Sequence, residues 1–112
     1  MKKVTVSYGE YLDRYTILKV KEAKGLDVKT ELKEYDLTEF SMVNYWEKLL
    51  TELHLMLWSI EDQKRTDSER YTSDYSDLST LTCQLNDIRH KVKKEIDLFY
   101  GSEFTEQKSH KI

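Results

Sequence analysis

The chain has 112 residues, of which 35% are charged and 38% hydrophobic, and its formal net charge is −3. It contains no proline and only three glycines, a composition that favours long helices and excludes a sandwich or barrel, which needs many more turn residues. The acidic balance argues against nucleic acid as the main partner, because phosphate backbones are bound by basic surfaces.

Hydropathy and cysteine content predict a cytoplasmic protein. No apolar run reaches the roughly 18–20 residues that span a bilayer, and the longest, LHLMLWSI (53–60), is too short. The opening MKKVTVSYGE is basic but lacks the apolar core of a secretory signal. Cys83 has no second cysteine in the chain to pair with, which fits a reducing compartment. We therefore expect no membrane span and a cytoplasmic location.

The first elements expected are a short strand at residues 3–6 and a helix from about 8 to 24. Val4 and Val6 alternate in the strand, as β-branched residues do. Ser7 and Glu10 form an S-x-x-E capping box at the start of the helix, and Gly25 suits its end. Apolar residues at helical spacing give this helix one stripe: Tyr8, Tyr11, Leu12, Tyr15 and Leu18. A second, short helical turn is expected within 28–35.

Two longer helices are expected at about 41–65 and 74–100, joined by a polar loop. The seam of the first is Val43, Trp46, Leu50, Leu53, Leu57 and Ile60. The seam of the second is Leu78, Leu81, Leu85, Ile88, Val92, Ile96 and Phe99, and Gly101 is expected to end it. Helices of this length joined by a short loop pack as an antiparallel hairpin. The predicted fold is a single all-α helical bundle over residues 1–112, with the tail 102–112 loosely packed.

Three stretches carry motifs of a known kind: SYGEYLDRYTILKVK (7–21), LWSIEDQKR (57–65) and LNDIRHKVKKEIDLFYGSEFTEQKSH (85–110). They resemble the patterns S-x-G-E-x-x-D-K, W-x-I-E-D, N-D-x-R and G-S-x-x-x-E-K-S of an uncharacterised bacterial and phage family, a domain of unknown function. Arg14, Val20, Asp97 and Gln107 depart from the family's pattern. The resemblance implies a fold and a set of motif residues but no reaction. Members also occur beside glycosyltransferase or tetratricopeptide segments, which implies a protein partner in polysaccharide biosynthesis.

The first helix offers a candidate ligand site. Gly9 leaves the amides of the first turn open to an anion, and Asp13 and Lys21 share one side of the helix without an obvious local partner. Gly9, Asp13 and Lys21 are therefore candidate ligand-binding residues. The competing interpretation is that the capping box uses the same donors and that Gly9 lets another backbone approach.

A catalytic alternative uses the carboxylates Glu10, Asp13, Glu61 and Asp62 with Asn86. In a small helical hydrolase, or a nucleotide- or nucleotide-sugar-binding protein, such a set holds Mg²⁺. Helix geometry opposes one shared ion, because Glu61 and Asn86 differ in level by about seven residues, or roughly 10 Å, along the hairpin. Glu61 can instead pair with Arg65 four residues on. The leading interpretation has no metal and no cofactor, and it leaves His54 partly exposed.

Apolar residues outside the seam of the central helix point to an interface: Leu49, Leu55, Met56 and Trp58. A domain of this size cannot easily cover every side of that helix, and exposed patches beyond a few hundred Å² usually mark an interface. We therefore expect a non-enzymatic interaction or assembly module that self-associates through the central helix, most simply as a homodimer.

Overall fold

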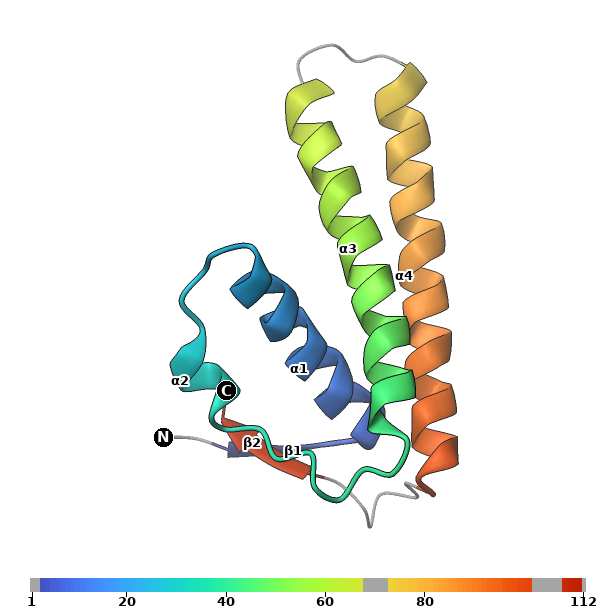
Figure 1. Cartoon of the computed structure of the whole chain (residues 1–112). Coiled ribbons are helices and arrows are strands. Elements are labelled where there is room, and N and C mark those ends of the chain that lie inside the picture. Colours follow the sequence, from blue (N-terminus) through green and yellow to red (C-terminus); the bar gives the residue numbers. More distant parts are fainter. Residues whose placement is uncertain (1–2, 68–72, 102–107, 112) are drawn as a thin grey trace.

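The computed structural model describes residues 3–67, 73–101 and 108–111. In chain order the elements are β1 (Lys3–Val6), α1 (Tyr8–Ala23), α2 (Lys29–Leu32), α3 (Val43–Asp67), α4 (Ser73–Phe99) and β2 (Lys108–Lys111). The predicted all-α helical bundle is confirmed. α3 and α4 stand side by side as an antiparallel hairpin, and α1 leans against the half of the hairpin that holds the start of α3 (Figure 1).

α3 begins two residues later than the sequence predicts. Met42 has a φ of 57°, a left-handed backbone that a right-handed helix cannot include. Met42 therefore turns the chain into α3, and its carbonyl oxygen accepts the Tyr45 amide at 3.2 Å. Beyond this start, the predicted seam holds the hairpin together through buried Leu53, Ile60 and Leu85, with Leu57, Leu78 and Val92 packed around them.

The larger core lies where α1 crosses the hairpin. Its buried residues come from β1, α1, α3, α4 and the segment before α3: Val6, Tyr8, Tyr11, Leu12, Phe40, Leu50 and Ile96. The Phe40 ring packs edge-on against Tyr8 and Tyr100, with ring centroids 5.2 and 5.1 Å apart. Phe40 lies between α2 and α3, outside any predicted helix, so no periodicity marked it as a core residue. Its burial fixes the chain between α2 and α3 against the base of the bundle.

Both ends of α1 form as the sequence predicts. The Ser7 hydroxyl accepts the Glu10 amide at 3.2 Å, so Ser7 caps the helix. At the other end Gly25 has a φ of 91°, and the Leu26 amide donates to the Lys21 carbonyl at 3.0 Å. This bond is the six-to-one closure of a Schellman motif, which needs a left-handed residue before it.

The short strand expected at the start of the chain pairs within the chain. β1 and β2 form an antiparallel ribbon in which Val4 lies opposite His110 and Val6 opposite Lys108. Of the tail expected to pack loosely, Lys108–Lys111 thus pair their backbone with β1, and residues 102–107 lie outside the described residues, so the packing of the tail as a whole stays a prediction. Four polar tail residues form a strand because β1 supplies unpaired backbone donors and acceptors beside them.

The seam prediction for α4 is wrong for Leu81 and Ile88, which are 42% and 45% exposed, whereas Phe99 is 50% exposed but packs against Trp46 of the α3 seam, with ring centroids 5.6 Å apart. Leu81, Ile88 and Phe99 are spaced seven and eleven apart and form one stripe of the helix. Successive residues of a helix are rotated by about 100° around its axis, so each residue faces a calculable direction. Going around α4 in one direction, the side with Lys93 contacts α1, the next side, with Leu85, contacts α3, and the side after that carries Ile88. α4 packs against two helices, so its buried side turns toward α1 and this stripe is left outside.

α3 repeats the same order of surfaces. His54 contacts α1, Leu53 contacts α4, and Met56 lies beyond Leu53, in one stripe with Tyr45 and Leu49. The outer stripes of α3 and α4 therefore share the side of the hairpin that faces away from α1. We call this surface the back face and define it as Tyr45, Leu49, Met56, Leu81, Ile88 and Phe99.

Candidate functional site

Gly9 is the point where α1 comes closest to α4. A Cβ at this position would lie 2.2 Å from the carbonyl oxygen of Lys93, so only glycine allows the two backbones to approach this far. The Gly9 amide donates to Oδ1 of Asp97 at 2.7 Å. Of the two interpretations of Gly9, the structure shows the close approach of a second backbone, and the carboxylate of Asp97 already takes this amide.

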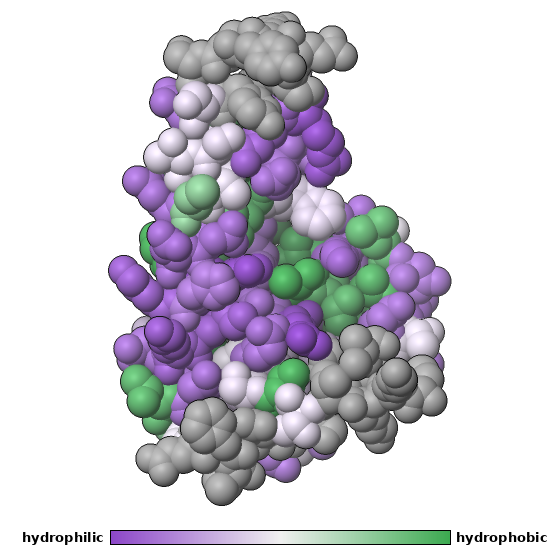
Figure 2. Space-filling view, turned by 180° about the vertical axis from the view of Figure 1, so that it is seen from behind, coloured by the Kyte–Doolittle hydropathy of each residue, from purple (hydrophilic) through white to green (hydrophobic). Residues whose placement is uncertain are grey.

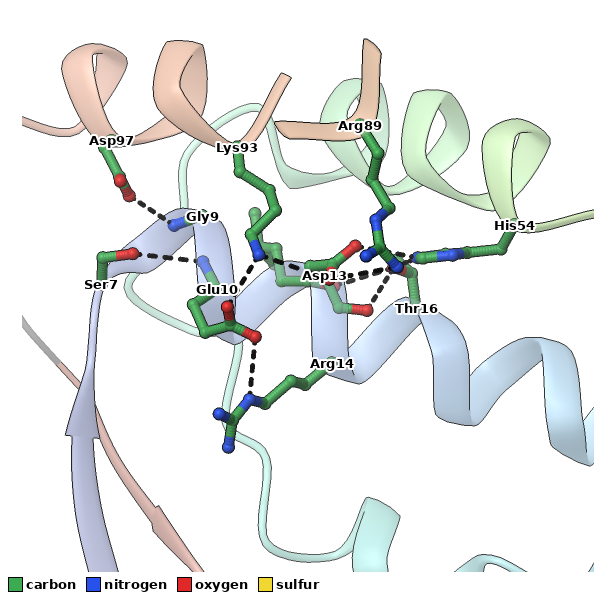
Figure 3. Close-up of polar contacts among 11 residues, drawn as sticks. Ser7, Gly9, Glu10, Asp13, Arg14, Thr16, His54, Arg89, Lys93 and Asp97 are labelled. Atoms are coloured by element: carbon green, nitrogen blue, oxygen red, sulfur yellow. Dashed lines mark hydrogen bonds and ion pairs between the residues drawn. The ribbon is translucent and has the colours of Figure 1, made fainter. Parts of the chain in front are cut away.

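Glu10 joins the same two helices through its side chain. Its Oε1 accepts from Nζ of Lys93 at 2.7 Å, and its Oε2 accepts from Nε of Arg14 at 2.9 Å (Figure 3). Partial burial raises the pKa of the Glu10 carboxyl, but the hydrogen bonds from Lys93 and Arg14 outweigh burial and hold this pKa below its ordinary value. The carboxylate therefore pairs with cations of α1 and α4, and within the described residues no hydrogen bond joins it to the Ser7 amide, the return bond that the predicted capping box requires.

Asp13 lies one turn further along α1 and is only 3% exposed. Its Oδ1 lies 3.1 Å from Nε2 of His54 on α3. Its Oδ2 lies 3.8 Å from Nζ of Lys93 and 3.9 Å from Nη1 of Arg89, both on α4 (Figure 3). Three helices thus contribute side chains around one buried carboxylate.

Thr16 completes this group and fixes the His54 ring. The Thr16 hydroxyl lies 2.9 Å from the carbonyl oxygens of Leu12 and Asp13, to which it donates, and its oxygen lies 3.1 Å from Nε2 of His54. The same ring nitrogen lies 3.1 Å from Oδ1 of Asp13, so His54 faces both Thr16 and Asp13. We call Asp13, Thr16, His54, Arg89 and Lys93 the Asp13 cluster.

The Asp13 cluster balances its buried charge mainly by nearby cations. Removing one partner of a buried ion pair typically costs about 3–5 kcal/mol, because the other charge stays buried without compensation. The expectation that His54 is partly exposed is wrong, since it is 6% exposed. His54 lies on the flank of the α3 seam, and α1 covers that flank only in the tertiary structure.

A groove of about 270 Å³ opens beside the Asp13 cluster, between α1 and the hairpin. Figure 2 shows this side of the molecule, where the surface is hollowed between the hairpin and the part that holds α1, with hydrophobic surface inside and hydrophilic surface around it. Its apolar lining comes from two helices: Ile17, Val20, Leu57 and Trp58. Its polar lining adds Lys21, His54, Glu61, Arg65 and Arg89. Three permanent cations therefore face one carboxylate.

The carboxylates of the catalytic alternative are each paired with basic residues. Glu61 lies 3.4 Å from Lys64 and Asp62 lies 3.4 Å from Arg65, both pairs three residues apart, so the expected pairing of Glu61 with Arg65 is replaced. Asn86 is half-buried on α4. Across the described ranges, no three His, Cys, Asp or Glu side chains are grouped as metal ligands would be. Glu10, Asp13, Glu61 and Asp62 each have a basic neighbour of their own.

The four predicted interface residues lie on three different surfaces of α3. Trp58 is half-buried in the groove, and the ammonium of Lys24 lies 5.8 Å from the centre of its ring. Met56 and the half-buried Leu49 belong to the back face, whereas Leu55, 39% exposed, points between these two sides. A run of neighbouring apolar residues in a helix cannot form one patch, because each step turns by about 100°.

Comparison with protein-family models, with curated proteins and with solved structures found no match. The resemblance noted in the sequence, and the partner in polysaccharide biosynthesis that it implies, remain predictions. Within the described part of the chain, no helix is both long and apolar enough to cross a bilayer.

Proposed function

We propose that this chain is a non-enzymatic assembly module in which two copies pair through their back faces. One observation carries the proposal: five of the six back-face residues are large apolar side chains with exposed fractions between 42% and 59%. They form two stripes on adjacent helices, and contiguous exposed apolar surface of this kind usually marks an interface.

The size of the back face fits a small interface. The α4 stripe from Leu81 to Phe99 is about 27 Å long and the α3 stripe from Tyr45 to Met56 about 16 Å, so two helices about 10 Å wide give roughly 430 Å² per copy. Two copies would together bury about 900 Å², at the low end of the range for protein complexes, where contacts are weak and transient. We therefore expect a reversible dimer with a dissociation constant in the micromolar range.

The charges beside the back face favour a second copy as the occupant. Lys91 and Glu95 are exposed one turn apart on α4, and Lys48 and Glu52 repeat this order on α3. A two-fold contact places the same surface on both partners, so an antiparallel arrangement brings a lysine of one copy to a glutamate of the other. A surface on which positive and negative charges alternate is more complementary to a second copy of itself than to a partner that carries charges of one sign.

The polar residues support an assembly role. Glu10 and Asp13, the two carboxylates that α1 turns toward α4, are each held by cations of the bundle. Their contacts fix how α1 docks on the hairpin, and α1 on one side leaves the back face as the uncovered side. The catalytic alternative requires the same carboxylates to meet at one ion or substrate.

Two neighbouring substitutions test the proposal. Met56→Glu places a charge in the centre of the back face, whereas Leu55→Glu places the same charge one residue away and outside it. Sedimentation equilibrium over a range of about 1–100 μM should show a dimer for the native chain and for Leu55→Glu, and a monomer for Met56→Glu. A native chain that stays monomeric over this range, or equal effects of the two substitutions, would contradict the proposal.

A further inference from the structure

The groove lies on the opposite side of the hairpin from the back face, and self-association does not account for it. Its polar lining has an excess of positive charge, with Lys21, Arg65 and Arg89 against Glu61. Glu61 is itself 3.4 Å from Lys64. Arg65 in turn lies 3.4 Å from Asp62 and Arg89 lies 3.9 Å from Asp13, so Lys21 is the cation of the lining to which no ion pair is assigned within the described residues.

Two of the groove cations have unused capacity to bind an anion. No hydrogen bond or ion pair joins the Lys21 ammonium to another residue of the described ranges. Arg89 makes one ion pair, at 3.9 Å to Asp13, and its Nε is buried without a hydrogen-bond acceptor in the described structure. A buried donor without a partner typically costs about 1–3 kcal/mol, so an acceptor that re-engages this guanidinium is favoured.

The rest of the groove suits a flat apolar body. Trp58 presents part of its indole, with Ile17, Val20 and Leu57 beside it. Ligand pockets usually measure about 300–1,000 Å³ and combine apolar walls with a few polar groups. At about 270 Å³, this groove matches one ring system with one charged group, and is too small for a dinucleotide.

We propose that the groove binds a small organic anion, a carboxylate or phosphate group joined to a flat apolar ring system. Lys21 and Arg89 meet the anionic group, and the ring lies against Trp58. The site brings together one residue of α1, one of α3 and one of α4. It therefore exists only when α1 is docked on the hairpin.

Two pairs of probes test the charge requirement and distinguish the two kinds of anionic group. Indole-3-acetate is compared with indole-3-acetamide, and adenosine 5′-monophosphate with adenosine. Each titration is followed through the indole N–H signals of the tryptophans in nitrogen–proton correlation spectra. At least one anion should shift the Trp58 signal and bind about tenfold or more tightly than its neutral partner, equivalent to about 1.4 kcal/mol. Preference for the acetate identifies a carboxylate site, and preference for the nucleotide identifies a phosphate site.

A matched pair of variants locates the effect. Lys21→Gln should weaken binding of the preferred anion about fivefold or more, while Lys19→Gln, which removes the same charge from an exposed pair with Glu22, should leave it within about twofold. Arg89→Lys keeps the charge but loses the planar fork, and should also weaken binding.

Three results would overturn the proposal. They are equal affinity for anion and neutral partner, equal affinity of the two lysine variants, and no shift of Trp58 up to roughly 10 mM of either anion. A glutamate-rich peptide that binds where neither small anion does would assign the groove to a protein segment and would equally refute it. None of these measurements depends on whether the back face pairs.

Discussion

Replacing Gly9 by alanine sets two physical effects of opposite sign against each other. In a helix free of contacts, alanine is more stable than glycine by about 1 kcal/mol. At Gly9, however, the added Cβ would lie 2.2 Å from the carbonyl oxygen and 2.9 Å from the carbonyl carbon of Lys93. These are backbone atoms of a long helix, which cannot swing aside as the end of a side chain can. The substitution therefore has to push α1 away from α4.

The expected cost follows from what that movement breaks. Overpacking a well-filled contact costs about 1–3 kcal/mol. Separating the helices also stretches the 2.7 Å hydrogen bond from the Gly9 amide to Asp97, and a bond to a charged group contributes about 1.5–3 kcal/mol. After the gain in helix propensity is subtracted, the free energy of unfolding should fall by roughly 2–5 kcal/mol. Domains of this kind are stable by only about 5–15 kcal/mol, so the loss is large.

Thermal and urea unfolding followed by circular dichroism measure this loss, which should appear as a fall in Tm of about 10 °C or more. Gly25→Ala is the matched control, because an added Cβ would meet no atom of the described residues within 4 Å apart from its chain neighbours, and only the φ of 91° opposes it. Its cost should be about 1–2 kcal/mol. Asp97→Ala in the Gly9→Ala background should not restore stability, because the clash is with the backbone of Lys93. A Gly9→Ala protein as stable as the native chain would refute the close approach of α1 and α4.

Three further substitutions probe the contacts around α1. Glu10→Gln should lower the free energy of unfolding near neutral pH and make it depend less on pH in the acid range. The pKa of Glu10 is lower in the folded state than its ordinary value near 4.5, so the ion pairs of Glu10 stabilise the fold above that value and this stabilisation is lost as pH falls through the folded pKa. If the urea midpoint of the Glu10→Gln protein varied with pH as that of the native chain does, the result would argue against the ion pairs of Glu10. Lys93→Met leaves Glu10 and buried Asp13 without their shared ammonium and should cost about 3 kcal/mol in urea unfolding; a loss below about 1 kcal/mol would mean that the other cations suffice. Tyr11→Phe removes the acceptor of the Asp36 amide, now bonded at 2.8 Å, and should cost about 1 kcal/mol with faster hydrogen exchange at that amide; unchanged exchange would speak against the bond.

Much of the helical framework could be predicted because its signals are local. Ser7 and Gly25 mark the two ends of α1 through the bonds that a helix end needs, and both work as expected. The periodic leucines predicted a hairpin of two long helices, and Leu53, Ile60 and Leu85 are buried in its seam. Capping and periodicity depend on residues within one or two turns of each other, so the order of residues is enough to reveal them.

The candidate site could be predicted only as a set of residues. Asp13 and Lys21 were recognisable as charges without a local partner, but Asp13 finds its partners on α3 and α4, whereas Lys21 opens into a groove. His54 was missed because a histidine on the flank of a seam looks half-exposed until another helix covers it. The spacing of residues along one helix does not show which residues of a second helix pack against it.

The sequence by itself determined which segments are helical, where α1 starts and stops, and that the chain forms one bundle, because propensity, capping and hydrophobic period act within a single segment. Only the tertiary structure decided that Gly9 is a point of contact between α1 and α4, that Lys108–Lys111 pair with β1, and that Ile88 lies on the back face. Each of these depends on the rotation and depth at which one element packs against another. Those quantities are set by the sum of many contacts between distant residues, and no local pattern encodes them.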